Sequence, residues 1–447
     1  MTLMNWQQLM SSTRFQIDEN GNIDVVEPKK DTQNWFRSGF HVDYDRLVFS
    51  NAFRRLGRKT QVHPLAKNDH THNRLTHSVE VGSVGRSLGN RVAGMLSMAK
   101  KLPENLDVND FGLVVQVACL AHDLGNPPFG HTGEDVLRAW FRQPEHACFL
   151  EGLRACEKND VQTYEGNAHS LRQVANLEMY YNRGGMRLSA ASVGALLKYP
   201  WTSSHCLGNK KFNIYQTELP FIRCVAEELG LPEKEKDEWA RHPLSYLMEA
   251  ADDICYALMD LEDAIDLELL DFSEVERVMN GLVDSELTWH VQNKRERIAM
   301  MRGLSIGRAV EEMAQTFVQH QHDLLNGEFK GKDLLSVCGE NVRTTLVEAK
   351  NLASDRVYRH RSKLIHELAA FPCLGSILDL LIPAVFAQCG EQNLTVQQEL
   401  ALELLEIPIG RGDNLYLSYM KVLDFIGGMT DNYAAKMARE LSGMDMV

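Results

Sequence analysis

The sequence lacks the features of a disulfide-rich or membrane-spanning protein. Its nine cysteines are an odd number, widely spaced and without a CxxC pair, and a chain of 447 residues is too large to need disulfide staples. No stretch approaches the roughly 20 apolar residues that a membrane span needs. The first residues, MTLMNWQQLMSSTRF, have neither the basic start nor the uninterrupted apolar run of a secretory signal. We therefore expect a cytoplasmic protein with reduced thiols and no membrane partner.

Basic residues are outnumbered, and two common hydrolase signatures are missing. The formal net charge is −14 and the isoelectric point is near 5.6, so any contact with nucleic acid or polyphosphate must come from local basic clusters. The chain contains neither a GxxxxGK(S/T) phosphate-binding loop nor a GxSxG nucleophile elbow. These absences disfavour P-loop and serine-nucleophile chemistry, and they direct attention to a metal ion and water.

Alternating, strand-like runs are scarce, whereas apolar residues at helical spacing dominate. Such spacing is clear at 113–124 and again at 244–258. With 44% hydrophobic residues, the chain can bury a large core. We predict an all-α fold in three parts. These are a polar N-terminal lead-in (1–30) with a short hairpin closed by the ENGN turn at 19–22, a helical catalytic domain (31–270), and a helical C-terminal region packed on it (271–447).

Four dispersed residues, in the order H…HD…D, have the side chains of a metal site. They are His77, the adjacent pair His122-Asp123, and Asp252. A neighbouring imidazole and carboxylate can reach one divalent ion where the backbone turns, and the glycine, asparagine and prolines at 125–128 break the helix there. Asp123 ends a strongly apolar run in which an unpaired buried carboxylate would cost several kcal/mol. Either a metal ion or a structural Asp–Arg pair would neutralise it.

The segment 249–264 contains two adjacent aspartates, and helical geometry favours the first as the fourth ligand. Asp252, Tyr256 and Asp260 are spaced i, i+4 and i+8 and share one helix face, whereas Asp253 lies on an apolar stripe. A polar stripe through an otherwise apolar helix suggests the wall of a wet pocket. We therefore place Tyr256 and Asp260 in the same pocket as the metal. In the alternative, Asp253 binds the metal and Asp252 caps or pairs.

His131 and Glu134 stand one helical turn apart, just beyond the proline pair. A histidine and a carboxylate at this spacing can share a proton, which orients the imidazole for acid or base work near neutral pH. Their closeness to His122-Asp123 favours a catalytic pair. In the alternative, Glu134 stabilises the start of a helix through its charge and His131 faces solvent.

Basic residues cluster at a few places against the acidic background. The segment 53–61 holds three arginines and a lysine, and Arg74 lies three residues before His77. If residues 74–77 are helical, the Arg74 guanidinium lies beside the metal, where phosphate oxygens would sit. Lys198 and Lys211, at the two ends of a loop, are placed to close over a polyphosphate tail from the other side.

These residues lie in sequence motifs, called words below, that resemble those of the HD-domain deoxynucleoside triphosphate triphosphohydrolases, in particular the bacterial dGTPase and dGTPase-like group. The resemblance covers most of the chain, and several of its words are long and rare. The words are NRLTHS (73–78), ACLAHDLGNPPFGHTGE (118–134), EAADDICYALMDLEDA (249–264), DYDRLVFSNAFRRLGRKTQV (43–62), YEGNAHSLR (164–172), LLKYPW (196–201) and LDFIGGMTDNYA (423–434).

This resemblance implies a helical HD fold with a helical C-terminal embellishment. It implies that metal-activated water attacks the α-phosphate of dGTP or several dNTPs and releases deoxynucleoside and inorganic triphosphate. One divalent ion per active site, Mn²⁺, Mg²⁺ or a similar transition metal, is implied as the cofactor. The implied roles are metal ligands (His77, His122, Asp123 and Asp252), a catalytic pair (His131 and Glu134), phosphate contacts (Arg74, Lys198 and Lys211) and deoxyribose contacts (Gln61, Tyr256 and Asp260).

One position departs from the pattern of the bacterial relatives. The EGNA word is followed by His169, where glutamine is more usual. In one interpretation His169 joins the catalytic cluster. In the other it faces solvent.

The resemblance also suggests partners and alternative functions. The relatives assemble as oligomers, so a homo-oligomer, hexameric or tetrameric, is expected, and the apolar run 374–387 fits either an interface or a buried core helix. The nearest alternative is another HD-type phosphohydrolase, acting on a cyclic nucleotide, guanosine tetraphosphate or a 5′-nucleotide. A second alternative is a nucleotide-sensing or single-stranded-DNA-binding oligomer with weak hydrolysis. DNA binding in addition to catalysis stays open.

Overall fold

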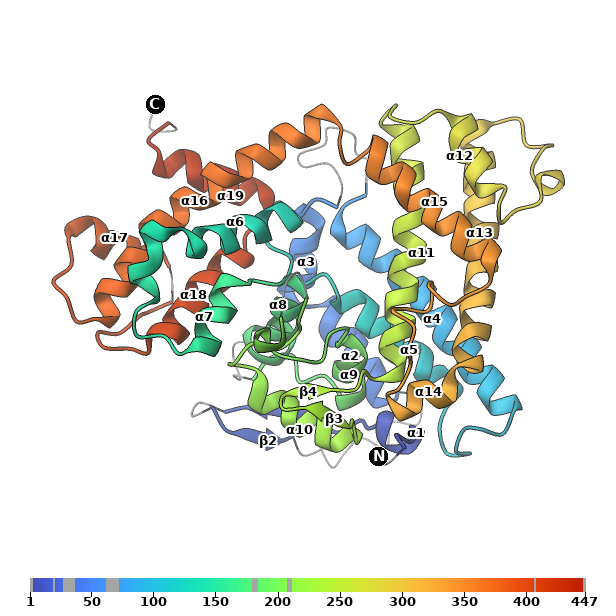
Figure 1. Cartoon of the computed structure of the whole chain (residues 1–447), viewed down its shortest axis with the longest axis horizontal. Coiled ribbons are helices and arrows are strands. Elements are labelled where there is room, and N and C mark those ends of the chain that lie inside the picture. Colours follow the sequence, from blue (N-terminus) through green and yellow to red (C-terminus); the bar gives the residue numbers. More distant parts are fainter. Residues whose placement is uncertain are drawn as a thin grey trace.

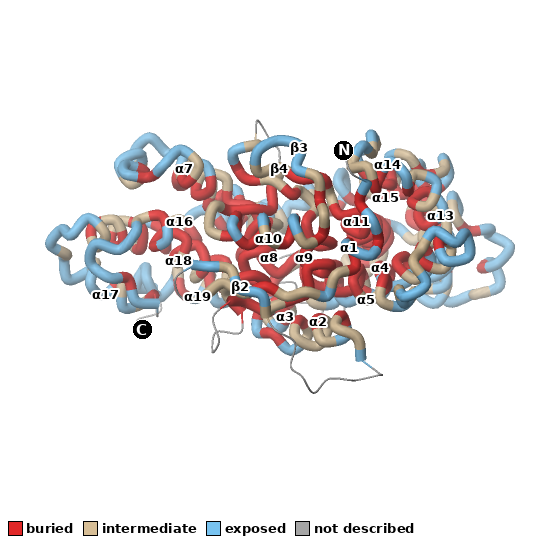
Figure 2. The backbone as a smooth tube through the Cα atoms, turned by 90° about the horizontal axis from the view of Figure 1, so that it is seen from below, coloured by how far each residue is buried: buried red, intermediate tan, exposed pale blue. Residues whose placement is uncertain are grey.

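The computed structural model describes residues 3–18, 21–26, 37–61, 72–178, 184–206, 211–405 and 407–444, apart from the side chain of Ser362. Helices dominate these residues, and the strands are confined to two short antiparallel hairpins (Figure 1). Buried residues concentrate in the middle of the elongated molecule, and its two ends are more exposed (Figure 2). The predicted all-α fold is therefore confirmed.

Most elements are short helices joined by turns. Apart from the N-terminal hairpin and the helices described in the next paragraphs, the elements are, in chain order, α2 (Gly39–Val48), α3 (Asn51–Arg55), η1 (Leu56–Arg58), η2 (Pro144–Leu150), α7 (Ala155–Gln162), α8 (Gly166–Arg172), the π-helical η3 (Gln173–Leu177), α9 (Ala190–Leu196), η5 (Ser203–His205), α10 (Leu219–Leu229), β3 (Glu233–Glu235), β4 (Glu238–Trp239), α12 (Phe272–Met279), η6 (Ser285–Leu287), α13 (Lys294–Gln319), α14 (Gln321–Asn326) and α15 (Glu340–Arg356).

The N-terminal segment contributes apolar side chains to the core. α1 (Trp6–Leu9) buries the residues at both of its ends. β1 (Phe15–Ile17) and β2 (Ile23–Val25) pair antiparallel and form the hairpin that the ENGN word predicted. Residues 19 and 20 of that turn lie outside the described residues. The N-terminal lead-in thus buries more apolar side chains than its polar composition suggests.

Two long antiparallel helices, α4 (Arg74–Met98) and α5 (Val108–Ala121), form the centre of the main core. They approach closely because small residues face the contact. A Cβ added at Gly89 would lie 2.7 Å from the carbonyl oxygen of Phe111, which is too close for any side chain. α11 (Pro243–Asp266) packs on both helices. This arrangement brings three distant parts of the sequence to one place.

A second hydrophobic core lies around α16 (Arg361–Cys389). Helices from both sides of the sequence contact α16 there: α6 (Gly130–Arg142), α17 (Val396–Leu404), α18 (Leu415–Gly427) and α19 (Asp431–Leu441). Buried residues of α12, α13 and α15 belong instead to the main core. The C-terminal region therefore packs as two groups on different parts of the chain, and its predicted boundary near residue 270 stays a prediction.

Among the described residues, α16 is also the one helix that is long and apolar enough to cross a membrane, over Lys363–Cys389. The expectation that no such stretch exists was therefore wrong. The packing of this helix against α6, α17, α18 and α19 accounts for its apolar composition. Its first turns are less covered, and Leu368 is 70% exposed.

Candidate active site

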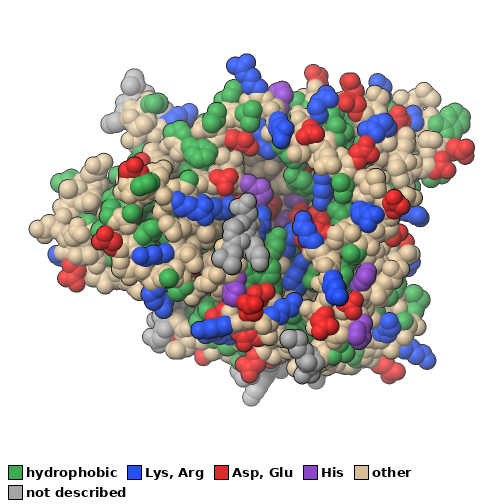
Figure 3. Space-filling model, viewed as in Figure 1, with side chains coloured by type: hydrophobic (Ala, Val, Ile, Leu, Met, Phe, Trp, Pro, Cys, Tyr) green, Lys and Arg blue, Asp and Glu red, His purple; other side chains and the backbone are tan. Residues whose placement is uncertain are grey.

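A cavity of about 370 Å³ opens where α4, α5 and α11 meet. Figure 3 shows a hollow near the middle of one face of the molecule, with histidine and charged side chains around it. The predicted site residues in the cavity wall are Gln61, Arg74, His77, His122, Asp123, His131, Glu134, Lys198, Lys211, Asp252 and Tyr256. The residues in this wall to which the sequence had assigned no role are Asn126, Asn167, Tyr199, Tyr358, Lys363 and Glu367.

Helix ends position the first predicted ligands. Asn73 caps α4, and its side chain accepts two backbone amides of the first turn, which contains Arg74 and His77. α5 ends immediately before His122 and Asp123, so both side chains project from its C-terminal end. His77 and the His122-Asp123 pair are far apart in the sequence. The antiparallel packing of α4 on α5 brings them together.

His77, His122 and Asp252 form a compact group whose potential ligand atoms all lie within 4.8 Å of one another. Asp252 Oδ1 is 3.1 Å from His77 Nε2 and 3.6 Å from His122 Nε2. His122 Nδ1 lies 2.6 Å from the Cys119 carbonyl oxygen, which can only accept, so Nδ1 carries the proton and Nε2 keeps its lone pair. The His122 imidazole in this state, together with the His77 imidazole and the Asp252 carboxylate, is a donor set that fits a divalent transition-metal ion.

The two adjacent aspartates of α11 have different partners. Asp252 faces the imidazoles, whereas Asp253 accepts a hydrogen bond of 2.6 Å from Lys350 Nζ on α15. Burial would raise the pKa of Asp252, but the imidazoles of His122 and His77 outweigh it and hold that pKa below its usual value. The structure therefore places Asp252 in the ligand group and makes Asp253 a link to α15.

Asp123 forms the Asp–Arg pair that the sequence left open. Its Oδ2 accepts from Arg74 Nη1 at 2.7 Å, and its Oδ1 accepts from Asn126 Nδ2 at 2.5 Å. The same Oδ1 lies 3.5 Å from His122 Nε2. A guanidinium thus neutralises the carboxylate, while one oxygen stays close enough to His122 for both residues to hold one ion. The metal role of Asp123 stays a prediction.

His131 and Glu134 lie in contact at the start of α6. His131 Nδ1 is 2.9 Å from one carboxylate oxygen of Glu134, and the other oxygen accepts from the Gly166 amide at 2.6 Å. Burial would raise the pKa of Glu134, but the hydrogen bond from His131 and the charges of Arg138 and Lys211 keep it below its usual value. An ionised Glu134 accepts a hydrogen bond from Nδ1–H, so Nε2 of the largely exposed imidazole can exchange a proton with a ligand.

Basic side chains reach the cavity from several parts of the chain. Arg74 comes from α4, Lys198 and Lys211 from the two ends of the predicted loop, and Lys363 from the first turn of α16. Lys198 also pairs with Glu249 on α11, at 3.1 Å. Several cations around one metal-type group make the cavity suited to a polyanion such as a phosphate chain.

Apart from Gln61, the basic segment 53–61 does not enter the cavity wall. Lys59 is buried and donates hydrogen bonds to the carbonyl oxygens of Asn126 at 2.5 Å and Gly427 at 2.6 Å. Burial lowers the pKa of Lys59 to about 7. This lysine therefore links the turn after α5 to the end of α18. The basic segment alone did not indicate this structural role.

Two stacked tyrosines, Tyr256 on α11 and Tyr358 just beyond α15, line one side of the cavity. The rings of Tyr256 and Tyr358 have centroids 5.9 Å apart. The Tyr358 hydroxyl donates to Asp260, whose pKa burial raises to about 7. Asp260 is not part of the cavity wall, so its predicted place in the pocket gains no support. The side-chain oxygen of Gln61 is buried without a hydrogen-bond partner among the described residues. Such an acceptor fits a ligand hydroxyl or amide.

Three residues of the cavity wall, Tyr358, Lys363 and Glu367, were not predicted from the sequence. They lie between the end of α15 and the first turns of α16, and Tyr358 follows its partner Asp260 by 98 residues. The density of aromatic and basic residues in YRHRSK (358–363) was the available signal. The predicted C-terminal embellishment therefore supplies part of the cavity wall.

His169 lies outside the cavity wall. Its side chain is fully buried, with Nε2 3.3 Å from the amide nitrogen of Gln173 and the ring packed 5.3 Å from that of Tyr164. Burial lowers the pKa of His169 well below its usual value. The solvent-facing alternative was therefore wrong, and a catalytic role gains no support from this position.

Comparisons with known proteins cover the whole of this site. The family model of the HD domain matches residues 74–159, which include three of the predicted ligands. The chain is 43% identical to a deoxyguanosinetriphosphate triphosphohydrolase-like protein of Pseudomonas aeruginosa over 98% of this chain and 99% of that protein. It is 34% identical to a protein of the same description from Synechocystis, over 99% and 100%. It is 30% identical to the deoxyguanosinetriphosphate triphosphohydrolase of Salmonella arizonae, over 91% and 94%.

Proposed function

This chain belongs to the HD-domain family of deoxyguanosinetriphosphate triphosphohydrolase-like proteins, and from that premise we propose that it hydrolyses deoxynucleoside triphosphates to deoxynucleoside and inorganic triphosphate. One observation carries the proposal. A single cavity combines the His77, His122 and Asp252 group with the His131–Glu134 pair and several basic side chains. Metal-type ligands, a proton carrier and a polyanion site are the parts that phosphate-ester hydrolysis by water requires.

Each group in the cavity has a chemical task in this reaction. A divalent ion, Mn²⁺, Mg²⁺ or a similar metal, held by the four predicted ligands would polarise the α-phosphate and lower the pKa of a bound water. Arg74, Lys198 and Lys211 would hold the phosphate oxygens. As water adds to the α-phosphorus, the bond to the sugar 5′-oxygen breaks and that oxygen needs a proton. His131, protonated at both ring nitrogens and held at Nδ1–H by Glu134, is placed to give that proton from Nε2, while the attacking water loses a proton to solvent.

The direct test is an incubation of the pure protein and Mn²⁺ or Mg²⁺ with each deoxynucleoside and ribonucleoside triphosphate. We expect one nucleoside and one inorganic triphosphate to be released per deoxynucleotide consumed. Separation of the products by ion-exchange chromatography measures both. Release of pyrophosphate or phosphate, or turnover of only cyclic nucleotides or guanosine tetraphosphate, would instead identify another HD-type phosphohydrolase.

Tyr256 is expected to set the preference for deoxyribose over ribose. Its ring, held by the stack on Tyr358, forms a rigid wall that leaves no room for a 2′-hydroxyl if the sugar lies against it. Tyr256→Ala should lower the ratio of kcat/KM for dNTP over rNTP by about 10-fold or more, in the range that a change in pocket fit supplies. Tyr256→Phe keeps the ring and should keep the ratio. Equal ratios in Tyr256→Ala and the wild type would contradict a steric role.

A cytoplasmic homo-oligomer, hexameric or tetrameric, remains part of the proposal. Apolar side chains on the surface of α16 and α17 support it, since Leu368 is 70% and Val396 73% exposed. Sedimentation or light scattering of the purified chain measures the assembly. Single-stranded DNA as an additional ligand is tested by binding at increasing salt, because phosphate contacts lose affinity steeply as salt rises.

A further inference from the structure

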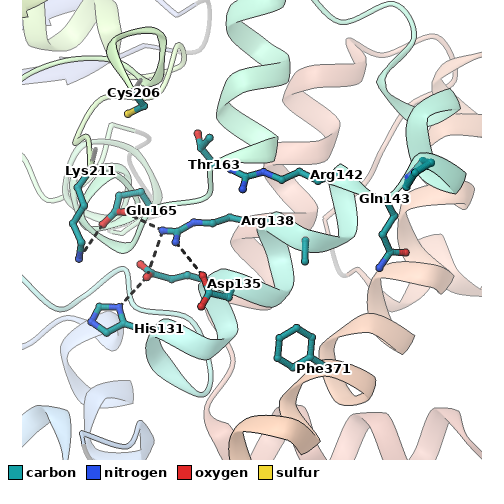
Figure 4. Close-up of a pocket in the computed structure, with 13 residues that line it drawn as sticks. His131, Asp135, Arg138, Arg142, Gln143, Thr163, Glu165, Cys206, Lys211 and Phe371 are labelled. Atoms are coloured by element: carbon teal, nitrogen blue, oxygen red, sulfur yellow. Dashed lines mark hydrogen bonds and ion pairs between the residues drawn. The ribbon is translucent and has the colours of Figure 1, made fainter. Parts of the chain in front are cut away.

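A second and larger cleft, of about 960 Å³, lies next to the metal cavity, that is, the cavity lined by His77, His122 and Asp252. His131, Glu134 and Lys211 line both spaces, so they form the partition between them. Figure 4 shows this cleft, with His131, Arg138, Glu165 and Lys211 gathered at one end of it. Residues of the second cleft can therefore contact His131 and Glu134 from the side opposite the His77, His122 and Asp252 group.

Arg138 occupies the centre of that support. It lies one turn after Glu134 on α6, and its Nη2 is 3.0 Å from Glu165 and 3.5 Å from Glu134. Its Nε donates to the carbonyl oxygen of Tyr164 at 2.6 Å, and its Nη1 to Asp135 at 3.3 Å. Each of the three guanidinium nitrogens thus has a partner, which restricts the orientation of the planar group.

Glu134 and Glu165 are two buried carboxylates that share this one guanidinium. Their side chains are each 3% exposed. Burial raises the pKa of Glu165, and the neighbouring charge of Glu134 raises it further. The other cation nearby, Lys211, is more distant from Glu165, at 3.9 Å, and is partly exposed. Without Arg138 the two carboxylates would repel each other in a poorly solvated place.

The geometry points to Arg138 and Glu165 as positioning residues of the His131–Glu134 pair. Arg138, anchored by Glu165 and by the Tyr164 carbonyl, holds the Glu134 carboxylate where it accepts the Nδ1 proton of His131. That hydrogen bond keeps Nδ1–H on Glu134 in both the neutral and the protonated imidazole, so Nε2 is the nitrogen that takes up and gives a proton. The inference rests on the proposed function only where it calls the pair catalytic.

A role for Arg138 as a direct phosphate contact fits the structure less well. Arg138 is not part of the metal-cavity wall, and its donors already have partners. Arg142, one turn further along α6, also lines the second cleft but is exposed and forms no ion pair with any described residue. Arg142 is therefore a matched control on the same helix.

The test compares Arg138→Met with Arg142→Met. We expect Arg138→Met to lower kcat for a dNTP by about 10- to 100-fold, the cost typical of residues that orient a reacting group. KM should stay close to that of the wild type, and Arg142→Met should keep the wild-type kcat. Adding Glu165→Gln to Arg138→Met should lower kcat little further, because the contact of Arg138 with Glu134 and Glu165 is already lost. Equal kcat in both arginine variants, or a loss confined to KM, would overturn the inference.

A second readout does not need turnover. With ¹⁵N-labelled histidine, the His131 signals, assigned by their loss in His131→Gln, should report the Nδ1–H tautomer in the wild type and in Arg142→Met. They should report a tautomer mixture in Arg138→Met. Arg138→Lys keeps the charge but not the planar guanidinium, so its share of the Nδ1–H tautomer should be intermediate. If the wild type hydrolyses no nucleotide, the proposed function fails while this readout still decides the positioning. If Arg138→Met does not fold, Arg138→Lys and Glu165→Gln decide it, and an unchanged tautomer in both overturns it.

Discussion

Replacing Asp252 with alanine is expected to remove both the bound metal and turnover. Asp252 supplies the carboxylate that lies between His77 Nε2 and His122 Nε2, so its loss leaves only two neutral imidazoles and Asp123, whose charge Arg74 already neutralises, to hold a divalent ion. Turnover should fall by more than about 100-fold, since residues that merely support a metal ligand already cost about 10- to 100-fold when they are replaced. Elemental analysis of the gel-filtered protein measures the metal independently of activity.

The neighbouring aspartate provides the control for this experiment. Asp253 has similar chemistry and lies on the same helix, but its carboxylate is committed to Lys350. Asp253→Ala should retain the metal and most of the activity, with a lower melting temperature because α15 loses a tie to α11. If Asp253→Ala lost the metal and Asp252→Ala kept it, the ligand assignment would be reversed.

Local geometry explains why the sequence predicted so much of this site. The adjacency of His122 and Asp123 needs no knowledge of the fold, and neither does the one-turn spacing of His131 and Glu134. The helical period likewise separates Asp252 from Asp253, because neighbouring residues on a helix point in different directions. Predictions of this kind depend on a few residues of backbone, and long periodic helices make that backbone predictable.

The predictions that failed depended on contacts between distant parts of the chain. Lys59 belongs to a basic cluster, and its burial against Asn126 and Gly427 cannot be deduced from a run of charges. Tyr358 was not considered, because its place beside Tyr256 depends on how α15 and α16 return to α11. His169 was expected in the catalytic cluster or in solvent, and it lies in neither place. Tertiary packing decides each of these positions.

Replacing His131 is expected to damage the chemical step without removing the metal. His131 lies in the cavity wall but outside the compact ligand group, so His131→Gln should bind metal and substrate nearly as the wild type does. Loss of a positioned proton carrier should lower kcat by about 10²- to 10⁴-fold. His146→Gln is the matched control, since His146 stacks on Trp140 in the second core and is absent from the cavity wall.

The identity of the leaving group can show what His131 does. The 5′-oxygen of a nucleoside is a poor leaving group and requires a proton, whereas a nitrophenolate leaves without one. If His131 donates that proton, the loss of kcat in His131→Gln should be large with a dNTP and much smaller with bis(4-nitrophenyl) phosphate. An equal loss with both substrates would contradict a proton donor and would mean that His131 acts on the attacking water or on the phosphate. The same pair of substrates applied to Arg138→Met should give the same pattern, because Arg138 acts through Glu134 on the Nδ1 side of the imidazole.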